Sequence, residues 1–219
     1  MKLLPVLLAV VLPATLCRAD LTIIQQIQQS KGTNNVDMTT TTKVKGDMAR
    51  IDVNPQMSML INLKTGDAVS LVIPQKVAMK ISGDMIKEMK KTAMPEGTAK
   101  PEPPKATGRK DTINGFACEE YTTTVDGKKI TLWVTKDAPD AQKAVAQLSQ
   151  LSAGDDPMAA ALSQENVPGF PVRAEIEMPD LGRITSTVVN VKSDALPDSD
   201  FTVPSDFKEM TPGVAPTGR

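Results

Sequence analysis

The stretch CEEYTTTVDGKKITLWV, residues 118–134, decides the fold class of this chain. Its two halves, Cys118–Val125 and Lys129–Val134, are rich in Thr, Val and aromatic residues, which favour strands. Asp126-Gly127 between them is a signal for a type I′ turn, a tight connection between antiparallel strands. Residues 118–134 therefore predict a β-hairpin, and the rest of the chain repeats this pattern.

Short strand-like segments separated by turn residues run through the whole chain. The clearest is Val36–Lys45, where the even-numbered residues from Val36 to Val44 share one face. Turn residues such as Gly46-Asp47 and Asn54-Pro55 connect neighbouring segments. We expect about ten strands; besides the hairpin they cover residues 21–28, 36–45, 48–53, 57–63, 68–73, 77–81, 172–178 and 183–191. A short edge segment is expected within 201–210.

Three short helices are expected between the strands. Residues 84–91 place Met85, Ile86 and Met89 on one side, residues 137–151 carry an apolar stripe, and Asp156-Pro157 starts a helix to residue 164. The predicted fold class is mainly β (α+β). It is a curved antiparallel sheet that forms a half-open β-barrel, with the helices covering one side.

Targeting signals stand at the N-terminus. Lys2, an apolar run over residues 3–16 and the small residue Ala19 predict a signal peptide, residues 1–19, cleaved after Ala19. Lipidation at Cys17 is the minor alternative, because Leu16 occupies the position where the lipoprotein signal peptidase requires a small residue. The expected location is therefore periplasmic or secreted. No other apolar run reaches the roughly 18 residues of a membrane span, so the mature chain has no predicted transmembrane segment.

After the signal peptide we expect a single half-barrel domain over residues 20–210 and a disordered tail over 211–219. Within the domain, residues 94–110 break all periodicity and contain several Pro and Lys residues. This composition is typical of a solvated inserted loop. The loop has two interpretations, a lid or an ordinary surface loop.

The composition excludes several classes of chemistry. The 219-residue chain has no histidine, which excludes Ser-His-Asp and Cys-His catalysis and His-ligated zinc. Cys118 is the one cysteine left after processing, so no intramolecular disulfide forms. A formal net charge of −1 gives no electrostatic footprint for nucleic acid. Glu119 and Glu120 point to opposite faces of a strand, so they are not a catalytic pair. We expect no cofactor, no metal site and no catalytic residue, and hence no enzyme.

Methionine supplies the one candidate site. The chain contains 12 Met against 4 Phe, 1 Trp and 1 Tyr. Flexible thioethers adapt to irregular apolar ligands, although they also fill gaps in ordinary cores. Packing under a helix is the alternative for the single tryptophan. The predicted lining of an apolar cavity consists of Met57, Met59, Met79, Met85, Met89, Leu132 and Trp133.

Several short motifs resemble a known family. They are Ile113-x-Gly115 with Tyr121, Leu132-Trp133-Val134 after the turn, Gly169–Arg173 before a strand, and Phe201-x-x-Pro204. Their order resembles domain of unknown function 4412, a family of small exported bacterial proteins, over nearly all of the mature chain. That family is similar in architecture to the periplasmic lipoprotein carriers and receptors LolA and LolB. The resemblance implies a half-open barrel whose apolar concavity, closed by helices, holds acyl chains, but it transfers no binding residue.

Two functional hypotheses follow. In the first, the chain is a non-enzymatic exported protein that binds a hydrophobic small molecule or a lipid acyl chain in an apolar cavity. In the second, it is an envelope structural or protein-interaction module whose core is filled. Its sheet edge or the loop over residues 94–110 then contacts an envelope protein partner.

Overall fold

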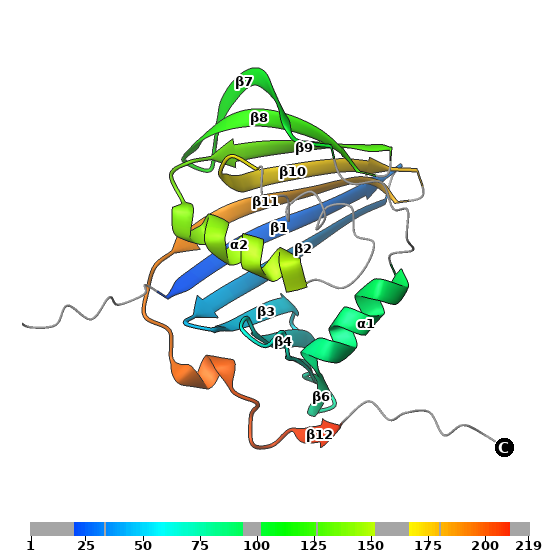
Figure 1. Cartoon of the computed structure of the whole chain (residues 1–219), viewed down its shortest axis with the longest axis vertical. Coiled ribbons are helices and arrows are strands. Elements are labelled where there is room, and N and C mark those ends of the chain that lie inside the picture. The colour runs from blue at the N-terminus through cyan, green and yellow to red at the C-terminus, as the bar shows by residue number, and fades with distance from the viewer. Residues whose placement is uncertain are drawn as a thin grey trace, which may run out of the picture.

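A single sheet of twelve strands forms the protein (Figure 1). The computed structural model describes residues 20–32, 34–93, 102–125, 127–151, 167–179 and 181–210. The strands are β1 (Leu21–Lys31), β2 (Asn34–Lys45), β3 (Met48–Asn54), β4 (Met57–Asn62), β5 (Ala68–Val72), β6 (Val77–Ile81), β7 (Lys105–Ile113), β8 (Phe116–Val125), β9 (Lys128–Thr135), β10 (Phe170–Met178), β11 (Gly182–Lys192) and β12 (Lys208–Met210).

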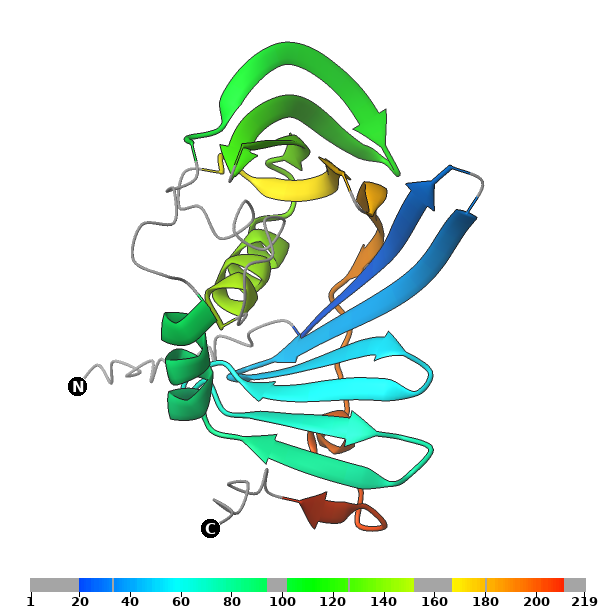
Figure 2. The same ribbon diagram turned by 90° about the vertical axis from the view of Figure 1, so that its right-hand side faces the viewer.

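Two antiparallel meanders make up this sheet. Strands β1 to β6 follow one another in space as in sequence, and so do β7 to β11. The long strands β1 and β11 join the two meanders in antiparallel register, with Ile23 opposite Val191 and Ile27 opposite Ser186. Strand β12 adds to β6 in parallel. The sheet is strongly curved and remains open, because its described edges β7 and β12 do not meet (Figure 2).

Helices α1 (Gly83–Ala93) and α2 (Pro139–Leu151) lie on the concave side of the sheet (Figure 2). Ala141 and Ala144 of α2 pack in one buried cluster with Ile23 and Phe170. Further along α2, Leu148 and Leu151 pack with Ile86 of α1 against a cluster formed by Ala49, Ile61 and Ala68. The apolar stripes of both helices thus cover the inward-facing residues of β1 to β5, as their 3.6-residue periodicity requires.

The opposite, convex face carries the C-terminal segment, residues 193–207, which includes a 3₁₀ turn at Asp198–Phe201. Lys43 Nζ lies 2.8 Å from Asp200 Oδ2, and Leu196 N donates to Asp20 Oδ2 at 2.8 Å. Val203 and Phe207 then pack on a cluster of Leu60, Leu71 and Ala78. Strands β4 and β5 therefore carry packed apolar side chains on both faces.

The predicted curved, mainly β sheet with helices on one side is confirmed. The expected number of about ten strands is too low, because β7 was not expected, while the short edge segment expected within 201–210 is the three-residue strand β12. The expectation of a wholly antiparallel sheet is wrong, because β12 pairs with β6 in parallel and makes the sheet mixed. β7 begins at Lys105 and so takes up residues 105–110 of the predicted loop; residues 94–101 lie outside the described part. The described residues contain two α-helices rather than three, and the helix predicted over 157–164 lies outside them.

The predicted signal peptide and tail, residues 1–19 and 211–219, also lie outside the described residues. Within the described part of the chain, no helix has the length and apolarity needed to cross a membrane.

Candidate functional site

A group of methionines lies at one end of the concave side. The strand register places Met59 of β4, Ser70 of β5, Met79 of β6 and Met210 of β12 in one row across the sheet. Met59 packs against the cluster that contains helix residues of α1 and α2, so this row is on the helix-covered face. We call six residues of this region the methionine surface: Met57, Met59, Met79, Met85, Met89 and Met210.

These methionines are unusually open to solvent. Met57 is 40 % exposed and Met79 is 37 % exposed, although both lie on strands. Met85 and Met89 on α1 and Met210 on β12 are also exposed, and together these are five of the eight exposed large hydrophobic residues in the described part. Met59, Met79 and Met210 share one row of the sheet, and Met57 lies two residues further along β4 on the same face. Exposed apolar side chains on one face mark a site for a ligand or a partner.

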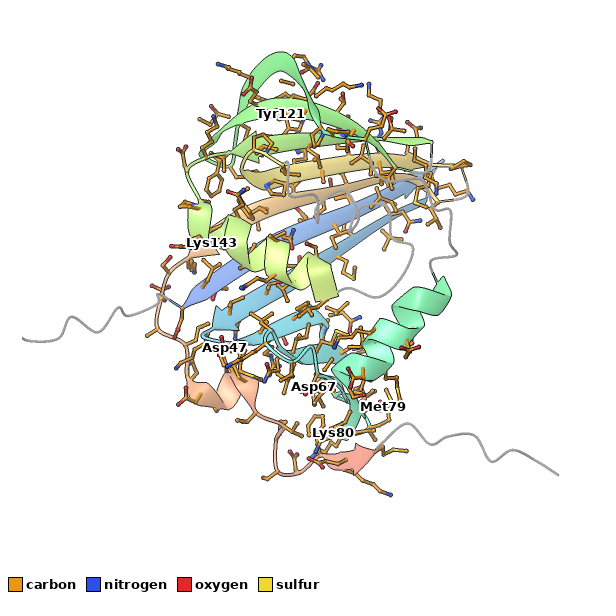
Figure 3. All side chains as sticks on the ribbon, viewed as in Figure 1. Asp47, Asp67, Met79, Lys80, Tyr121 and Lys143 are labelled. Carbon is orange, nitrogen blue, oxygen red and sulfur yellow. The ribbon has the colours of Figure 1, made fainter. Side chains whose placement is uncertain are left out.

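Local hydrogen bonds fix α1 beside β6. The Asp67 carboxylate accepts a hydrogen bond from Gly83 N at 2.8 Å, and Met85 N donates to Ser82 Oγ at 3.2 Å. Bonds from the Thr65 hydroxyl and the Gly83 N–H lower the pKa of Asp67. Because α1 begins two residues after β6 ends, this cap holds the start of α1 beside the end of β6, the strand that carries Met79 (Figure 3).

The structure separates the other two predicted residues from the methionine surface. Leu132 is fully buried on β9, in a cluster with Ile130, Val134 and Ala174. It is therefore part of the core of the second meander. Side-chain alternation along β9 sends Trp133 to the opposite face, where it is half-buried and packs against another cluster.

A charged pair accompanies Trp133. The Arg109 guanidinium lies 5.7 Å from the centre of its ring, and Arg109 Nε donates to Glu120 Oε1 at 2.9 Å. The Glu120 side chain is buried, and this pairing raises the pKa of Arg109. These contacts connect the edge strand β7 to the sheet, and we infer that Trp133 contributes to the connection.

Sequence reasoning missed a cleft of mixed polar and apolar lining on the convex face. It has a volume of about 610 Å³, and its lining includes Asp37, Thr41, Arg50, Asp52 and Ser58. Arg50 bonds to Asp52, to Ser58 and to the carbonyl of Asp200, so its guanidinium holds the C-terminal segment on the sheet. The signal in the sequence for this cleft was the pair Arg50 and Asp52, two charged residues that alternation along β3 places on the same face.

A smaller cleft of about 230 Å³ lies beside Cys118, Glu119 and Tyr121. Burial raises the pKa of the Cys118 thiol, which makes the thiolate scarce. None of the seven predicted lining residues borders either of these two clefts. In the described ranges no group of three or more Cys, Asp or Glu side chains is placed to hold a metal ion.

Comparison with solved structures finds distant likenesses. PNGF-II is 14% identical with a TM-score of 0.42; the match covers 87% of this chain but 31% of that one, so the chain spans less than a third of its length. A LolA-superfamily protein from Nitrosomonas europaea is 12% identical with a TM-score of 0.36, covering 84% of this chain and 90% of that one. A putative outer membrane lipoprotein-sorting protein domain from Vibrio parahaemolyticus is 12% identical with a TM-score of 0.36, covering 84% and 89%.

No curated protein matches the sequence. The profile of one family, domain of unknown function (DUF4412), matches residues 19–207, which is most of the chain and includes every strand from β1 to β11. The chain therefore belongs to the DUF4412 family, as the motifs around Gly115, Tyr121 and Trp133 indicated.

Proposed function

We propose that this chain is a non-enzymatic, exported protein that binds a lipid or another hydrophobic ligand on the concave side of its sheet. The methionine surface is the observation that carries the proposal. Its side chains come from β4, β6, β12 and α1, and most of them are exposed. Water contact at these thioethers is unfavourable, and an apolar ligand that covers them removes it.

The residue type favours a ligand of irregular shape. Methionine is unbranched and has a polarisable sulfur atom, so a group of methionines adjusts to different apolar surfaces. The neighbouring cluster of Ala49, Ile61 and Ala68, with the ends of α1 and α2 packed on it, supplies a rigid apolar base. A flexible layer on a rigid base suits acyl chains better than it suits a single rigid ring system.

Export and the periplasmic or secreted location belong to the same proposal. They rest on the signal-peptide pattern in residues 1–19, with cleavage after Ala19. On this basis the ligand is a hydrophobic molecule that the protein meets outside the cytoplasm.

The alternative function is an envelope interaction module that presents a sheet edge to a partner. Strand β7 is the longer edge, and nearly all of its residues are exposed. However, Arg109 N is bonded to Thr107 Oγ1, Thr112 N is bonded to Asp111 Oδ1, and the pairing with β8 is interrupted between Ala106 and Lys110. Bulges, local caps and positive charges are devices that keep an edge from pairing, so β7 is poorly suited to strand addition.

A fluorescent hydrocarbon tests the proposal. Diphenylhexatriene fluoresces when it leaves water, so its titration into the purified protein gives a dissociation constant. We expect the double variant Met57→Gln/Met79→Gln to bind it at least about fivefold more weakly, because polar side chains replace exposed apolar ones. The matched control is Leu181→Gln, which changes an equally exposed residue at the β10–β11 turn and should bind like the wild type. Equal binding by all three proteins, or no binding by the wild type, contradicts the proposal.

A further inference from the structure

Two neighbouring clefts on the convex face form one groove. The cleft of about 610 Å³ that Asp37, Thr41 and Asp52 border adjoins a second cleft of about 210 Å³, whose lining includes Gln28, Asp37 and Thr185. The two clefts meet at the side chain of Asp37, which borders both. We call them together the convex groove. It lies on the opposite face of the sheet from the methionine surface, and the proposed function does not use its side chains.

The strands under the convex groove carry polar side chains that stand opposite one another on neighbouring strands. The register arranges them in three rows: Thr185–Gln28–Asp37, Thr187–Gln26–Thr39 and Thr41–Asp52–Ser58. Successive rows are two residues apart on β2, which corresponds to about 7 Å. Hydroxyl and amide groups both donate and accept hydrogen bonds, and carboxylates accept them. A ligand that lies along β2 therefore meets partners of both kinds along its whole length.

An ion pair with fixed geometry forms the floor at one end of the groove. Arg50 Nε donates to Asp52 Oδ1 at 2.7 Å, and Ser58 Oγ donates to the same oxygen at 2.6 Å. Ser58 is only 3 % exposed, so this arrangement is built into the sheet. Both bonds end on Oδ1, which leaves Asp52 Oδ2 to accept a hydrogen bond from a ligand.

The charges of the groove narrow the class of ligand. The Asp52 carboxylate is compensated by Arg50, the one cation among the lining residues of the two clefts, and Asp37 makes no ion pair within the described ranges. An anionic ligand is therefore repelled at Asp37. A ligand with a cation at each end gains at Asp37 but meets the Arg50 guanidinium at the other end. An uncharged ligand avoids both costs.

An uncharged oligosaccharide has the hydrogen-bonding groups that this groove requires. Its hydroxyls donate as well as accept, and two adjacent hydroxyls on one ring reach both oxygens of a carboxylate. Pro55 and Ile73 at the border of the larger cleft offer apolar contacts to the C–H face of a sugar ring. Asp37 and Thr41 are four residues apart on one strand, about 14 Å, which leaves room for several rings in line.

A peptide fits this face less well. The strands β1 to β4 and β11 each have a neighbour on both sides, so their main-chain groups are used within the sheet. A peptide that binds by strand addition needs a free sheet edge. Recognition in the convex groove therefore depends on side-chain hydrogen bonds, which a polyhydroxylated ligand matches.

We propose that the convex groove binds a neutral oligosaccharide along β2, whose hydroxyl groups donate to Asp37 and to Asp52 Oδ2 and accept a hydrogen bond from Thr41. This is a second binding function, on the face of the sheet opposite the methionine surface, and it does not rest on the ligand proposed for the concave side.

Calorimetric titration of neutral and charged probes into the purified protein tests the proposal. The neutral probes are the trisaccharides maltotriose, cellotriose and the trimer of N-acetylglucosamine. The charged probes are the trimer of galacturonic acid, which is anionic, and spermidine, which is cationic. We expect at least one neutral trimer to bind, and each charged probe to bind at least about tenfold more weakly than that trimer.

Two variants of the groove locate the binding. Asp37→Ala removes a charged acceptor and should weaken binding of the neutral trimer about tenfold, and Thr41→Val removes one hydroxyl and should weaken it about fivefold. The matched control is Asp140→Ala, which removes an exposed carboxylate on α2 at the other face of the sheet and should bind like the wild type. Met57→Gln/Met79→Gln should also bind like the wild type, because the methionine surface is on the concave side.

The inference is overturned if no neutral trimer binds, or if a charged probe binds more tightly than every neutral one. It is also overturned if Asp37→Ala and Thr41→Val both bind the neutral trimer like the wild type, because the sugar then lies elsewhere. Urea unfolding of each variant confirms that it is folded before binding is compared. Loss of diphenylhexatriene binding contradicts the proposed function on the concave side and leaves this inference standing, so the two failures are distinguishable.

Discussion

Truncation of two apolar residues distinguishes the core of this protein from its proposed site. Leu132 is fully buried among Ile130, Val134 and Ala174, whereas Met79 is 37 % exposed. Leu132→Ala removes three buried carbon atoms, worth about 2.4 kcal/mol of transfer free energy at about 0.8 kcal/mol each. The cavity that remains raises the expected loss of unfolding free energy to about 3–4 kcal/mol. At about 2–4 °C per kcal/mol for a chain of this size, Tm should fall by about 10 °C.

Met79→Ala removes a side chain of similar size but should lower the unfolding free energy by less than about 1 kcal/mol, because much of that side chain already contacts water. The assay is urea unfolding followed by the fluorescence of Trp133, the single tryptophan, together with titration of diphenylhexatriene. Leu132→Ala should change stability and leave affinity intact, and Met79→Ala should do the reverse. If Leu132→Ala unfolds like the wild type and loses the probe, Leu132 lines the site and its assignment to the core is wrong.

Three further predictions concern single residues. Hydrogen bonds from Thr65 and Gly83 lower the pKa of Asp67, so its ionised form stabilises the fold at neutral pH, and this stabilisation disappears as the pH falls from about 4 through the lowered pKa. The urea midpoints of Asp67→Asn and the wild type should therefore differ at pH 7 and converge in acid. A difference that stays constant with pH would contradict this. Burial raises the pKa of Cys118, so Ellman's reagent should react with the mature chain only after unfolding, and fast reaction of the folded protein would disprove the burial. Gly182→Ala places a Cβ against the carbonyl of Ser30 and should destabilise the fold far more than Gly46→Ala, which meets open space; equal denaturation midpoints would argue against this packing.

The sequence predicted the local elements of the fold well. The hairpin of β8 and β9 and the strand β2 lie where alternation and turn residues placed them. Helices α1 and α2 also lie within a residue or two of their predicted bounds, because capping residues and apolar spacing mark both ends. These are features that neighbouring residues determine.

The elements that were missed depend on contacts between distant residues. Strand β7 contains Gly108 at a positive φ of 81° and follows a run of prolines, so its composition is that of a loop. Pairing with β8 and the bonds of Arg109 to Glu120 are what make it a strand. The junction of β1 with β11 likewise joins residues far apart in sequence, and no local pattern announces it.

The residues of the candidate site were likewise predicted only in part. Met57, Met59 and Met79 share a face because strands alternate with a period of two, and the structure places them on β4 and β6, on either side of β5, as the hairpin connections imply. The sequence also placed Leu132 and Trp133 in the lining, but both residues lie on β9 in the second meander, away from the methionine surface. Which residues line a concavity depends on how the sheet curves, and alternation does not determine the curvature.

Native mass spectrometry tests the central claim most directly. The full chain would be expressed with its export signal, purified without detergent and transferred intact to the gas phase, and organic extraction would follow. We predict a reproducible adduct whose mass matches one lipid or other acyl amphiphile and which is reduced in Met57→Gln/Met79→Gln. A clean mass for the mature chain alone, unchanged after incubation with phospholipid or fatty acid, would contradict the account.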